Sequence, residues 1–304
     1  MMKGIVLPEV DQEELEKVKN ARIDEVVNDE EIKEIMVKYH LDYNFVKENL
    51  YYFNLFKKDR DNCRNCQGIS TCPKKENHLQ FTLKIDKNMK VSLGFKKCKY
   101  ELELDRIKAK YTTRQFPNYL LGYKMRDLLD TFAIARQPIV KKMMEFRKKP
   151  SEKGLFIHGS KGTGKSFMLA VFSTYLAKVD ETKSLCFIDF GNEVKSLKKF
   201  FDENIDYFDY YIDEMKTSQY LFLDDLGKEF KNEFVLKNVL LPVLKYRKEN
   251  KKATFITSNY EIKDIRTTYT YSHDSYLMAG ELMDLLDSQE VELELNGLPY
   301  LKIK

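Results

Sequence analysis

The sequence lacks any long run of apolar residues. No stretch of its 304 residues approaches the roughly 20 uninterrupted apolar residues that a membrane-spanning helix needs, so we expect no membrane anchor. The first 20 residues of the chain are rich in acidic side chains and lack the long apolar core of a secretory signal. The chain also has no internal repeat and no low-complexity tract. These absences favour a cytoplasmic protein.

Cysteine is scarce, with five residues, and a cytoplasmic chain rarely uses cysteine for a disulfide framework. Four of them lie in the first third, as Cys63, Cys66, Cys72 and Cys98, and C-x-x-C is a common half-site for zinc. Four thiolates would form a closed tetrahedral site that stabilises a small domain. His78 is an alternative to Cys72 as the fourth ligand. Free thiols are another interpretation, as is a redox pair, although the thioredoxin-like context of such a pair is absent.

The positive charge is concentrated in one segment. The net charge is +4, and residues 106–153 hold 13 Lys and Arg against 4 Asp and Glu. By contrast, residues 1–105 hold 19 against 20, and residues 154–304 hold 20 against 24. Such a segment attracts phosphates or an acidic partner surface. A solvated helical face is the alternative interpretation.

The apolar pattern divides the chain into two domains, as its length also suggests. Residues 9–60 show helical spacing, and residues 79–95 alternate on both sides of a turn, which predicts a β-hairpin. We therefore expect a small, zinc-stabilised α+β domain over residues 1–105, followed by a basic linker over residues 106–130.

Residues 131–304 have the pattern of an α/β domain. Short apolar runs separated by helical stretches indicate a parallel sheet with helices on its faces. The runs are GLFIHG, SLCFIDF, YLFLDD and ATFITSN. Cys186, in the second run, is expected in the core. The chain then alternates again before Asn296 and Gly297, a pair typical of a hairpin turn.

The stretch FIHGSKGTGKSF meets the pattern G-x-x-x-x-G-K-[ST] with Gly159, Gly164, Lys165 and Ser166. It follows an apolar strand and precedes a helix, which is the context that a phosphate-binding loop needs. Its N–H groups and the helix N-terminus attract phosphate oxygens. Lys165 would reach the β- and γ-phosphates of ATP, and Ser166 would hold Mg²⁺. The expected nucleotide-binding residues are Gly159, Ser160, Gly162, Thr163, Gly164, Lys165, Ser166 and Phe167.

Two further strand ends complete the predicted catalytic site. Asp224 and Asp225 follow the apolar run YLFL. We expect Asp224 to bind Mg²⁺ through water and Asp225 to polarise the attacking water. Asn259, after the next run, is the candidate sensor of the γ-phosphate, or else a simple turn residue. A further strand between the phosphate loop and the aspartates favours the AAA+ and RecA side of this class over simple kinases.

Contact with single-stranded DNA would combine cations with aromatic rings. The candidates after the second strand are Lys195, Lys198, Lys199, Phe200 and Phe201. The lysines are the better candidates, because an amphipathic helix would place most of the aromatic rings in the core.

The motifs GSKGTGKSF, LFLDDLG, LPVLKYR and FITSN together resemble the DnaC/DnaI-type family of bacterial helicase loaders, and more distantly the initiator DnaA. The resemblance implies an AAA+ ATPase domain that lacks the helical lid, and only 45 residues follow Asn259. It implies that the N-terminal domain binds the hexameric replicative helicase and that the C-terminal domain binds ATP and single-stranded DNA. Several copies could assemble on the helicase, beside other primosome proteins, at replication initiation and restart.

One departure from the family concerns arginine. Members carry arginines in a helix after the TSN strand, one of which acts on a neighbour's γ-phosphate, but the matching stretch GELMDLLDSQE has none. Arg247 and Arg266 are possible substitutes, and Lys302 or Lys304 could act in cis. Because such a finger accelerates hydrolysis strongly, we expect slow turnover and an ATP-gated switch.

Three alternatives remain at this stage. The chain could be the ATPase partner of another DNA-processing enzyme, as in transposition, although such relatives usually lack the cysteine cluster. It could be a hydrolysis-poor adaptor or inhibitor of the helicase. A metabolic kinase is the most distant alternative, because no small-molecule acceptor site is visible.

Overall fold

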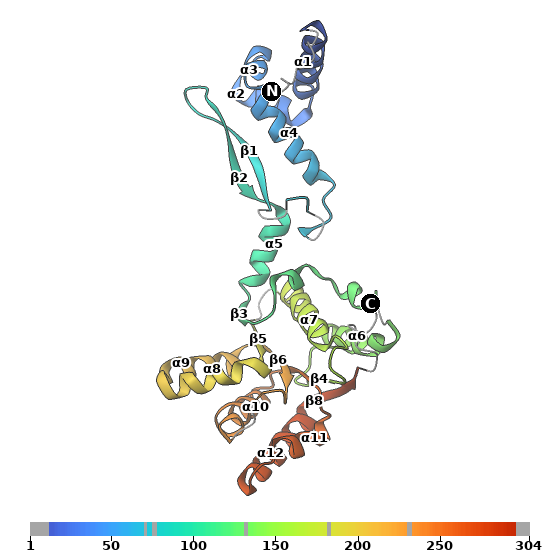
Figure 1. Ribbon diagram of the computed structural model, residues 1–304, viewed down its shortest axis with the longest axis vertical. Coiled ribbons are helices and arrows are strands. Elements are labelled where there is room, and N and C mark those ends of the chain that lie inside the picture. The colour runs from blue at the N-terminus through green and yellow to red at the C-terminus, as the bar shows by residue number, and fades with distance from the viewer. Residues whose placement is uncertain are drawn as a thin grey trace, which may run out of the picture. The chain divides into compact units, whose positions relative to one another are not determined.

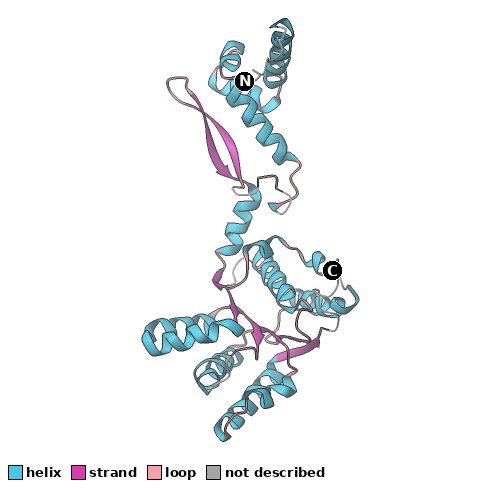
Figure 2. Cartoon of the chain, in the orientation of Figure 1, coloured by secondary structure: helices cyan, strands magenta, loops and turns pink. Residues whose placement is uncertain are grey.

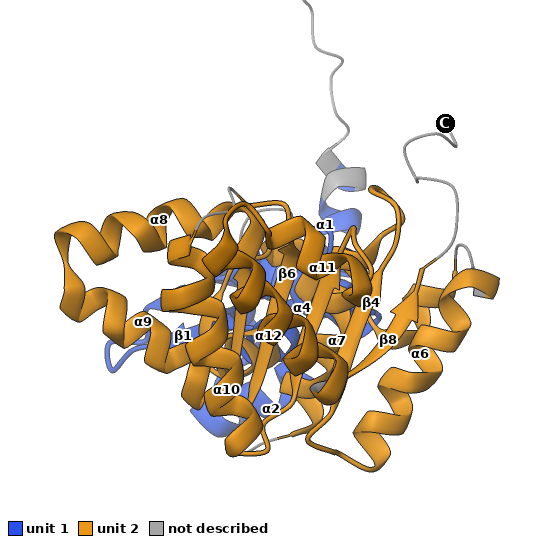
Figure 3. Cartoon of the chain, turned by 90° about the horizontal axis from the view of Figure 1, so that it is seen from below, with its two compact units in different colours: residues 1–102 blue, residues 103–304 orange. Residues whose placement is uncertain are grey.

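The computed structural model describes residues 12–69, 72–74, 78–130, 133–180, 184–229 and 233–295. The chain divides into two compact units, residues 1–102 and residues 103–304, which Figure 3 colours blue and orange. Each unit has its own sheet and its own buried core, and Figure 2 shows that helices make up most of both.

The first unit is a helical cluster with one β-hairpin, as the sequence predicts. The two strands are antiparallel, and the carboxylate of Asp86 supports their turn by accepting the N–H groups of Asn88 (2.8 Å) and Lys90 (2.9 Å). Its elements, labelled in Figure 1, are α1 (Gln12–Val27), α2 (Glu30–Tyr39), α3 (Tyr43–Glu48), α4 (Leu50–Arg64), β1 (Leu79–Ile85) and β2 (Val91–Lys97).

Apolar side chains from the helices and the hairpin form the core of the first unit. Asp29 begins α2 by accepting the N–H of Ile32 (3.3 Å), and the guanidinium of Arg60 on α4 contacts the same carboxylate. Asp59 of α4 accepts the N–H of Phe81 on β1 (2.9 Å), which joins helix to hairpin. The buried residues of this core are Val26, Ile32, Leu41, Val46, Phe53, Phe56 and Val91.

The second unit is built on a six-stranded sheet in the order β3-β5-β6-β7-β4-β8, and every neighbouring pair is parallel. This confirms the predicted α/β fold with a parallel sheet and flanking helices. The strands are β3 (Tyr111–Arg114), β4 (Gly154–His158), β5 (Leu185–Asp189), β6 (Tyr220–Leu226), β7 (Thr254–Ser258) and β8 (Glu290–Glu294).

Alternate residues of each central strand enter different cores, because successive side chains of a strand point to opposite faces. Phe156 and Ile256 join one cluster, whereas Leu155, Ile157 and Phe255 join the other. One face carries α5 (Lys99–Lys108), the 3₁₀ turns η2 (Asn118–Gly122) and η3 (Met125–Leu129), α6 (Ala133–Lys148) and α7 (Lys165–Val179). The other carries α8 (Phe190–Glu203), α9 (Ile205–Thr217), the π-helical turn η4 (Val235–Leu240), α10 (Leu241–Glu249), α11 (Ile262–Tyr269) and α12 (His273–Gln289).

Residues 106–130 are part of the second unit, which differs from the predicted linker. Within this range β3 pairs with β5, and Leu120, Leu121 and Leu128 are buried in the core. The four residues of β3 and the two short 3₁₀ turns are too brief to give a periodic apolar pattern. The high charge of the segment therefore concealed a buried element.

Other features of the second unit refine the predicted topology. The strand that lies between β4 and β6 in the sheet is β7, whereas β5 lies beyond β6. Helices α11 and α12 pack their apolar faces into the core of the sheet, so the described residues after β7 do not form a separate lid.

β8 pairs in parallel with β4, and the predicted hairpin at Asn296 and Gly297 lies outside the described residues. No helix in the described ranges is long and apolar enough to cross a bilayer.

Candidate nucleotide site and cysteine cluster

The predicted phosphate-binding loop joins β4 to α7 at the carboxyl edge of the sheet. Gly159 (φ 144°) and Gly164 (φ 99°) adopt backbone conformations that other residues reach only with strain. A Cβ on Gly159 would come within 2.5 Å of the Leu295 carbonyl oxygen, and a Cβ on Gly164 within 2.6 Å of the Arg136 guanidinium. The backbone angle favours glycine at both positions, and the close backbone carbonyl adds a second reason at Gly159, whereas the Arg136 side chain could move away from a Cβ at Gly164. Thr163 closes the loop by donating to the carbonyl of Ser160 (3.0 Å).

Lys165 begins α7 and folds back over the loop. Its ammonium donates to the carbonyls of Gly159 (2.8 Å) and Ser160 (3.0 Å) and to Oδ1 of Asn259 (3.0 Å). Burial lowers the pKa of Lys165, while Asp225 and Asp224 oppose this shift. The structure thus brings together the predicted phosphate-binding lysine and the predicted sensor, which are 94 residues apart in the sequence. A phosphate that entered here would compete with three neutral oxygens for the lysine.

Asp224 lies two residues before the end of β6 and is buried. Its Oδ1 accepts a short hydrogen bond from the hydroxyl of Thr257 on β7. Burial raises the pKa of Asp224 to about 6, and hydrogen bonds from Thr257 and Ser166 oppose that rise. Ser166 and Asp224, the two predicted magnesium ligands, therefore lie together. Oxygen donors of this kind suit Mg²⁺.

Asp225 has a left-handed backbone (φ 60°), which is strained for a residue with a Cβ. Its N–H donates to Thr257 Oγ1 (2.9 Å), and its carboxylate pairs with Lys228 (2.9 Å). The left-handed backbone interrupts the regular alternation of the strand at this point, and the register between β6 and β7 shifts between Leu223 and Leu226. Asp225 remains the predicted water-polarising residue.

A cleft of about 690 Å³ opens beside the phosphate-binding loop. Ser166, Asp224 and Asp189 line one part of it, and aromatic side chains line another. Phe167 packs edge-on against Tyr123 of the segment between η2 and η3, with ring centroids 4.9 Å apart. The cleft therefore combines an oxygen-rich end with an apolar end, as the triphosphate and the base of a nucleotide require.

The sequence reasoning missed three residues at this site. Asp189 is the register neighbour of Asp224, and its Oδ1 is buried with no hydrogen-bond partner among the described residues. Arg136, on α6, donates to the carbonyl of Thr163 (3.4 Å) in the phosphate-binding loop. Asp189 follows an apolar run, as Asp224 follows the run YLFL, which was a usable signal. The hydroxyl of Thr257 within an apolar strand was another, whereas nothing local marked Arg136.

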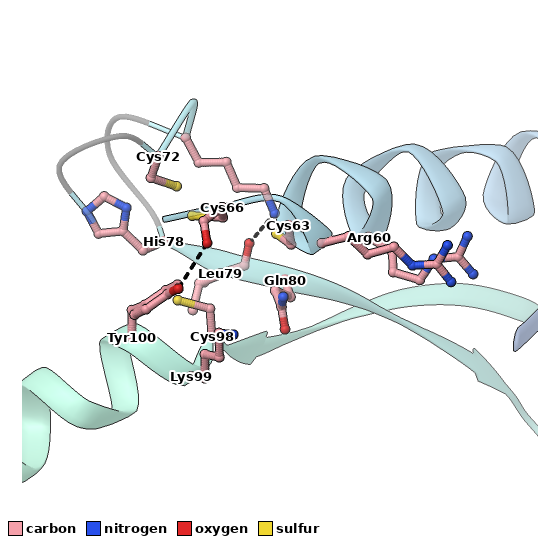
Figure 4. Close-up of a pocket in the computed structure, with 12 residues that line it drawn as sticks. Arg60, Cys63, Cys66, Cys72, His78, Leu79, Gln80, Cys98, Lys99 and Tyr100 are labelled. Atoms are coloured by element: carbon pink, nitrogen blue, oxygen red, sulfur yellow. Dashed lines mark hydrogen bonds between the residues drawn. The ribbon is translucent and has the colours of Figure 1, made fainter. Parts of the chain in front are cut away.

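The cysteine cluster of the first unit surrounds a separate cavity of about 250 Å³. Figure 4 shows the thiols of Cys63, Cys66, Cys72 and Cys98 and the imidazole of His78 around it. These donors suit zinc chemically. In the described residues, however, no group of three or more His, Cys, Asp or Glu side chains is arranged to hold a metal ion. Nδ1 of His78 is buried, and within the described ranges it has no hydrogen-bond partner.

Arg247 does not suit the role of an arginine finger. It is completely buried and donates to Thr254 Oγ1 (2.9 Å) and to backbone carbonyls that include those of Met215 (3.0 Å) and Ser218 (2.8 Å). It therefore holds the end of α9 against β7 inside one chain. Arg266 stacks over the ring of Tyr276 at 3.9 Å, between α11 and α12. Lys302 and Lys304 lie outside the described residues.

The predicted DNA-binding lysines lie on the exposed face of α8, but acidic neighbours compensate two of them. Lys198 pairs with Asp202 (3.6 Å), and Lys199 pairs with Glu203 (3.7 Å). Phe200 is partly buried against the core, as the amphipathic-helix interpretation predicts. Phe201 is exposed, although its ring contacts Phe208 and Phe234.

Comparison with known proteins confirms the resemblance found in the sequence. The chain is 22% identical over 298 residues to the replicative helicase loader DnaI of Bacillus subtilis (strain 168), and the match covers 94% of this chain and 93% of the relative. A crystal structure of DnaI matches with a TM-score of 0.53 and 24% identity, over 62% of this chain and 98% of that one. A putative primosome component from Streptococcus pyogenes serotype M3 matches with a TM-score of 0.52 and 24% identity, over 64% and 97%. No protein-family model matches the chain.

Proposed function

We propose, from the premise that this chain resembles a replicative helicase loader along almost its whole length, that it is an ATP-dependent loader of the hexameric replicative helicase onto single-stranded DNA. The observation that carries the proposal is that the match runs through both units and spans the predicted nucleotide site. The proposed role is at replication initiation and restart, together with other primosome proteins.

The second unit is the proposed AAA+ ATPase. In the nucleotide-bound state, Lys165 exchanges the carbonyls of Gly159 and Ser160 for the β- and γ-phosphates, which also compensates the cost of its burial. Ser166 and Asp224 would hold Mg²⁺, which would supply neutralisation of charge on the phosphates. Asp225 orients the attacking water and accepts its proton. Phe167 and Tyr123 provide the apolar end of the cleft for the base.

ATP binding acts in this proposal as an assembly switch. When Lys165 turns to the phosphates, Asn259 loses the ammonium that it contacts at 3.0 Å and becomes available to the γ-phosphate. Asn259 follows β7, which also carries Thr257, so the sensor and the support of both aspartates lie on one strand. Hydrolysis is proposed to be slow, because residues 280–290 contain no arginine and Arg247 is buried.

The first unit is the proposed helicase-binding part, stabilised by one zinc ion. Cys63, Cys66 and Cys98 are three proposed ligands. His78 is the preferred fourth ligand over Cys72, because its buried Nδ1 lacks a hydrogen-bond partner in the part of the chain that the structure describes. A closed site of this kind supports folding and takes no part in hydrolysis.

The first test is light scattering on a size-exclusion column with the hexameric helicase of the same cell. It compares ATP, ADP and the variant Lys165→Ala, which should fold because the hydrogen bonds of the lysine to the described residues go to two loop carbonyls and Asn259. A large complex that requires ATP and intact Lys165 supports the loader. A complex that ignores the nucleotide supports the second candidate, a helicase adaptor, which the missing arginines favour. No complex would contradict both and favour the ATPase partner of another DNA enzyme.

A further inference from the structure

The parallel sheet gathers cations at the edge opposite the nucleotide site. Lys148 ends α6 and Lys149 follows it, Lys153 precedes β4, and Lys251 precedes β7. Leu155 on β4 pairs with Phe255 on β7, so Lys153 and Lys251 lie near the same end of adjacent strands. We call this surface the basic edge and define it as Lys141, Arg147, Lys148, Lys149, Lys153 and Lys251, all of which are exposed.

The outer face of α6 extends the basic edge. Ile139, Val140, Met143 and Phe146 bury the inner face of the helix. Lys141, Lys142, Glu145 and Arg147 are exposed on its outer face. Residues 141–153 contain six Lys and Arg but only two carboxylates, Glu145 and Glu152. Among the described residues, Lys142 is the only one of these six cations within 4.0 Å of a carboxylate, that of Glu145 (2.9 Å). Most of the charge is thus available to a partner.

Two other parts of the second unit carry mainly negative charge. The carboxyl edge of the sheet carries Asp189, Asp224 and Asp225. The α8–α9 hairpin, residues 190–217, holds seven Asp and Glu against four Lys. Figure 3 shows this hairpin and α6 at opposite ends of the second unit. A polyanion is therefore attracted to the basic edge and repelled by the hairpin.

We propose that the basic edge binds the phosphate backbone of single-stranded DNA. The inference rests on the proposed loader function, which requires contact with the strand, and it replaces the α8 lysines suggested by the sequence. Flexible single-stranded DNA suits this edge, because its backbone can follow cations at the end of α6 and before β4 and β7. These cations need to contact only phosphates and not bases. The nucleotide site at the other edge stays open while the strand is bound.

The test measures the affinity of the full chain for a fluorescent oligothymidylate in the presence of ATP, between about 50 and 200 mM salt. The test variant is Arg147→Gln/Lys148→Gln/Lys149→Gln. The matched control is Lys195→Gln/Lys198→Gln/Lys199→Gln on α8, which also removes three exposed cations. All six positions are exposed, so both variants should fold, and equal melting temperatures would verify this.

We expect the α6 variant to bind at least about tenfold more weakly at low salt, and the slope of log affinity against log salt to fall by about 2, since each lost phosphate contact contributes about 0.7. The α8 control should bind like the parent. Equal binding by the α6 variant and the parent, or an equal loss in the α8 control, would overturn the inference.

The helicase complex is measured on the same variants, which separates this inference from the proposed function. If the parent forms the ATP-sensitive helicase complex but binds no oligothymidylate, the inference fails and the loader proposal loses only its DNA contact. If the α6 variant keeps DNA binding but loses the helicase, the basic edge binds an acidic protein surface, which also contradicts the inference. Intact DNA binding without any helicase complex would contradict the proposed function alone.

Discussion

The hydroxyl of Thr257 bridges two consecutive aspartates, because it donates to Oδ1 of Asp224 and accepts the N–H of Asp225 (2.9 Å). A single side chain on β7 thereby fixes both the buried carboxylate and the strained backbone of the residue after it. Since β7 also leads to Asn259, the strand connects the proposed metal ligand, the proposed water-orienting residue and the proposed sensor.

Thr257→Val should reduce the rate of ATP hydrolysis by about tenfold or more, because valine keeps the shape of threonine but leaves Asp224 and the Asp225 N–H without their shared partner. Thr257→Ser keeps the hydroxyl and should retain most of the activity. The measurement is phosphate release with and without the helicase. Equal activity of the valine variant and the parent would show that the bridge has no part in the reaction.

Asp224→Asn should stabilise the nucleotide-free protein at neutral pH and abolish Mg²⁺-dependent nucleotide binding. Burial raises the pKa of Asp224 from 3.8 to about 6. Between these values the folded state keeps a proton that the unfolded state has released, so this group lowers stability as pH rises through about 6. At neutral pH the ionised Asp224 therefore lowers the free energy of unfolding by at most about 3 kcal/mol.

The check on Asp224→Asn is thermal unfolding as a function of pH. The variant should melt above the parent near neutral pH, and the difference should disappear below about pH 4, where the parent carboxyl is protonated in both states. A variant that is less stable than the parent at all pH values would contradict the assignment of burial as the dominant cause.

Arg247→Met should destabilise the second unit by about 3 kcal/mol or more, because several buried carbonyls lose their donor together. Thermal unfolding of the full chain measures the loss. Arg266→Ala is the matched comparison, and its smaller effect is expected because Arg266 is only half-buried and stacks on Tyr276. A stable Arg247→Met variant that loses only assembly-dependent hydrolysis would instead restore the arginine-finger role.

Metal analysis of the purified chain should find one zinc per molecule. His78→Asn and Cys98→Ser should lower the zinc content to a small fraction, and Cys72→Ser should leave it unchanged. A chelator should lower the melting temperature of the parent, since zinc binding contributes to folding. Loss of zinc in Cys72→Ser with retention in His78→Asn would reverse the choice of the fourth ligand. A zinc-free parent would refute the site.

Local sequence patterns determined much of this protein. The spacing Gly159, Gly164, Lys165 and Ser166 predicts a phosphate-binding loop because positive backbone angles and a helix start are encoded within a few residues. The runs that became β4 to β7 were recognisable because both faces of these strands are buried, which demands continuous apolar residues. The hairpin of β1 and β2 followed from simple alternation around its turn.

Only the tertiary structure decided which distant residues meet. Arg247 resembled a reactive cation in the sequence, and the fold buries it among carbonyls at the end of α9 and just before β7. Asp189 becomes the neighbour of Asp224 only because β5 pairs with β6 in that register. The short strand β3 could not be recognised in the sequence, because it lies in a basic segment and is too short to show a periodic apolar pattern. The basic edge forms because parallel strands bring their amino ends together, and strand order is a long-range property that no local pattern contains.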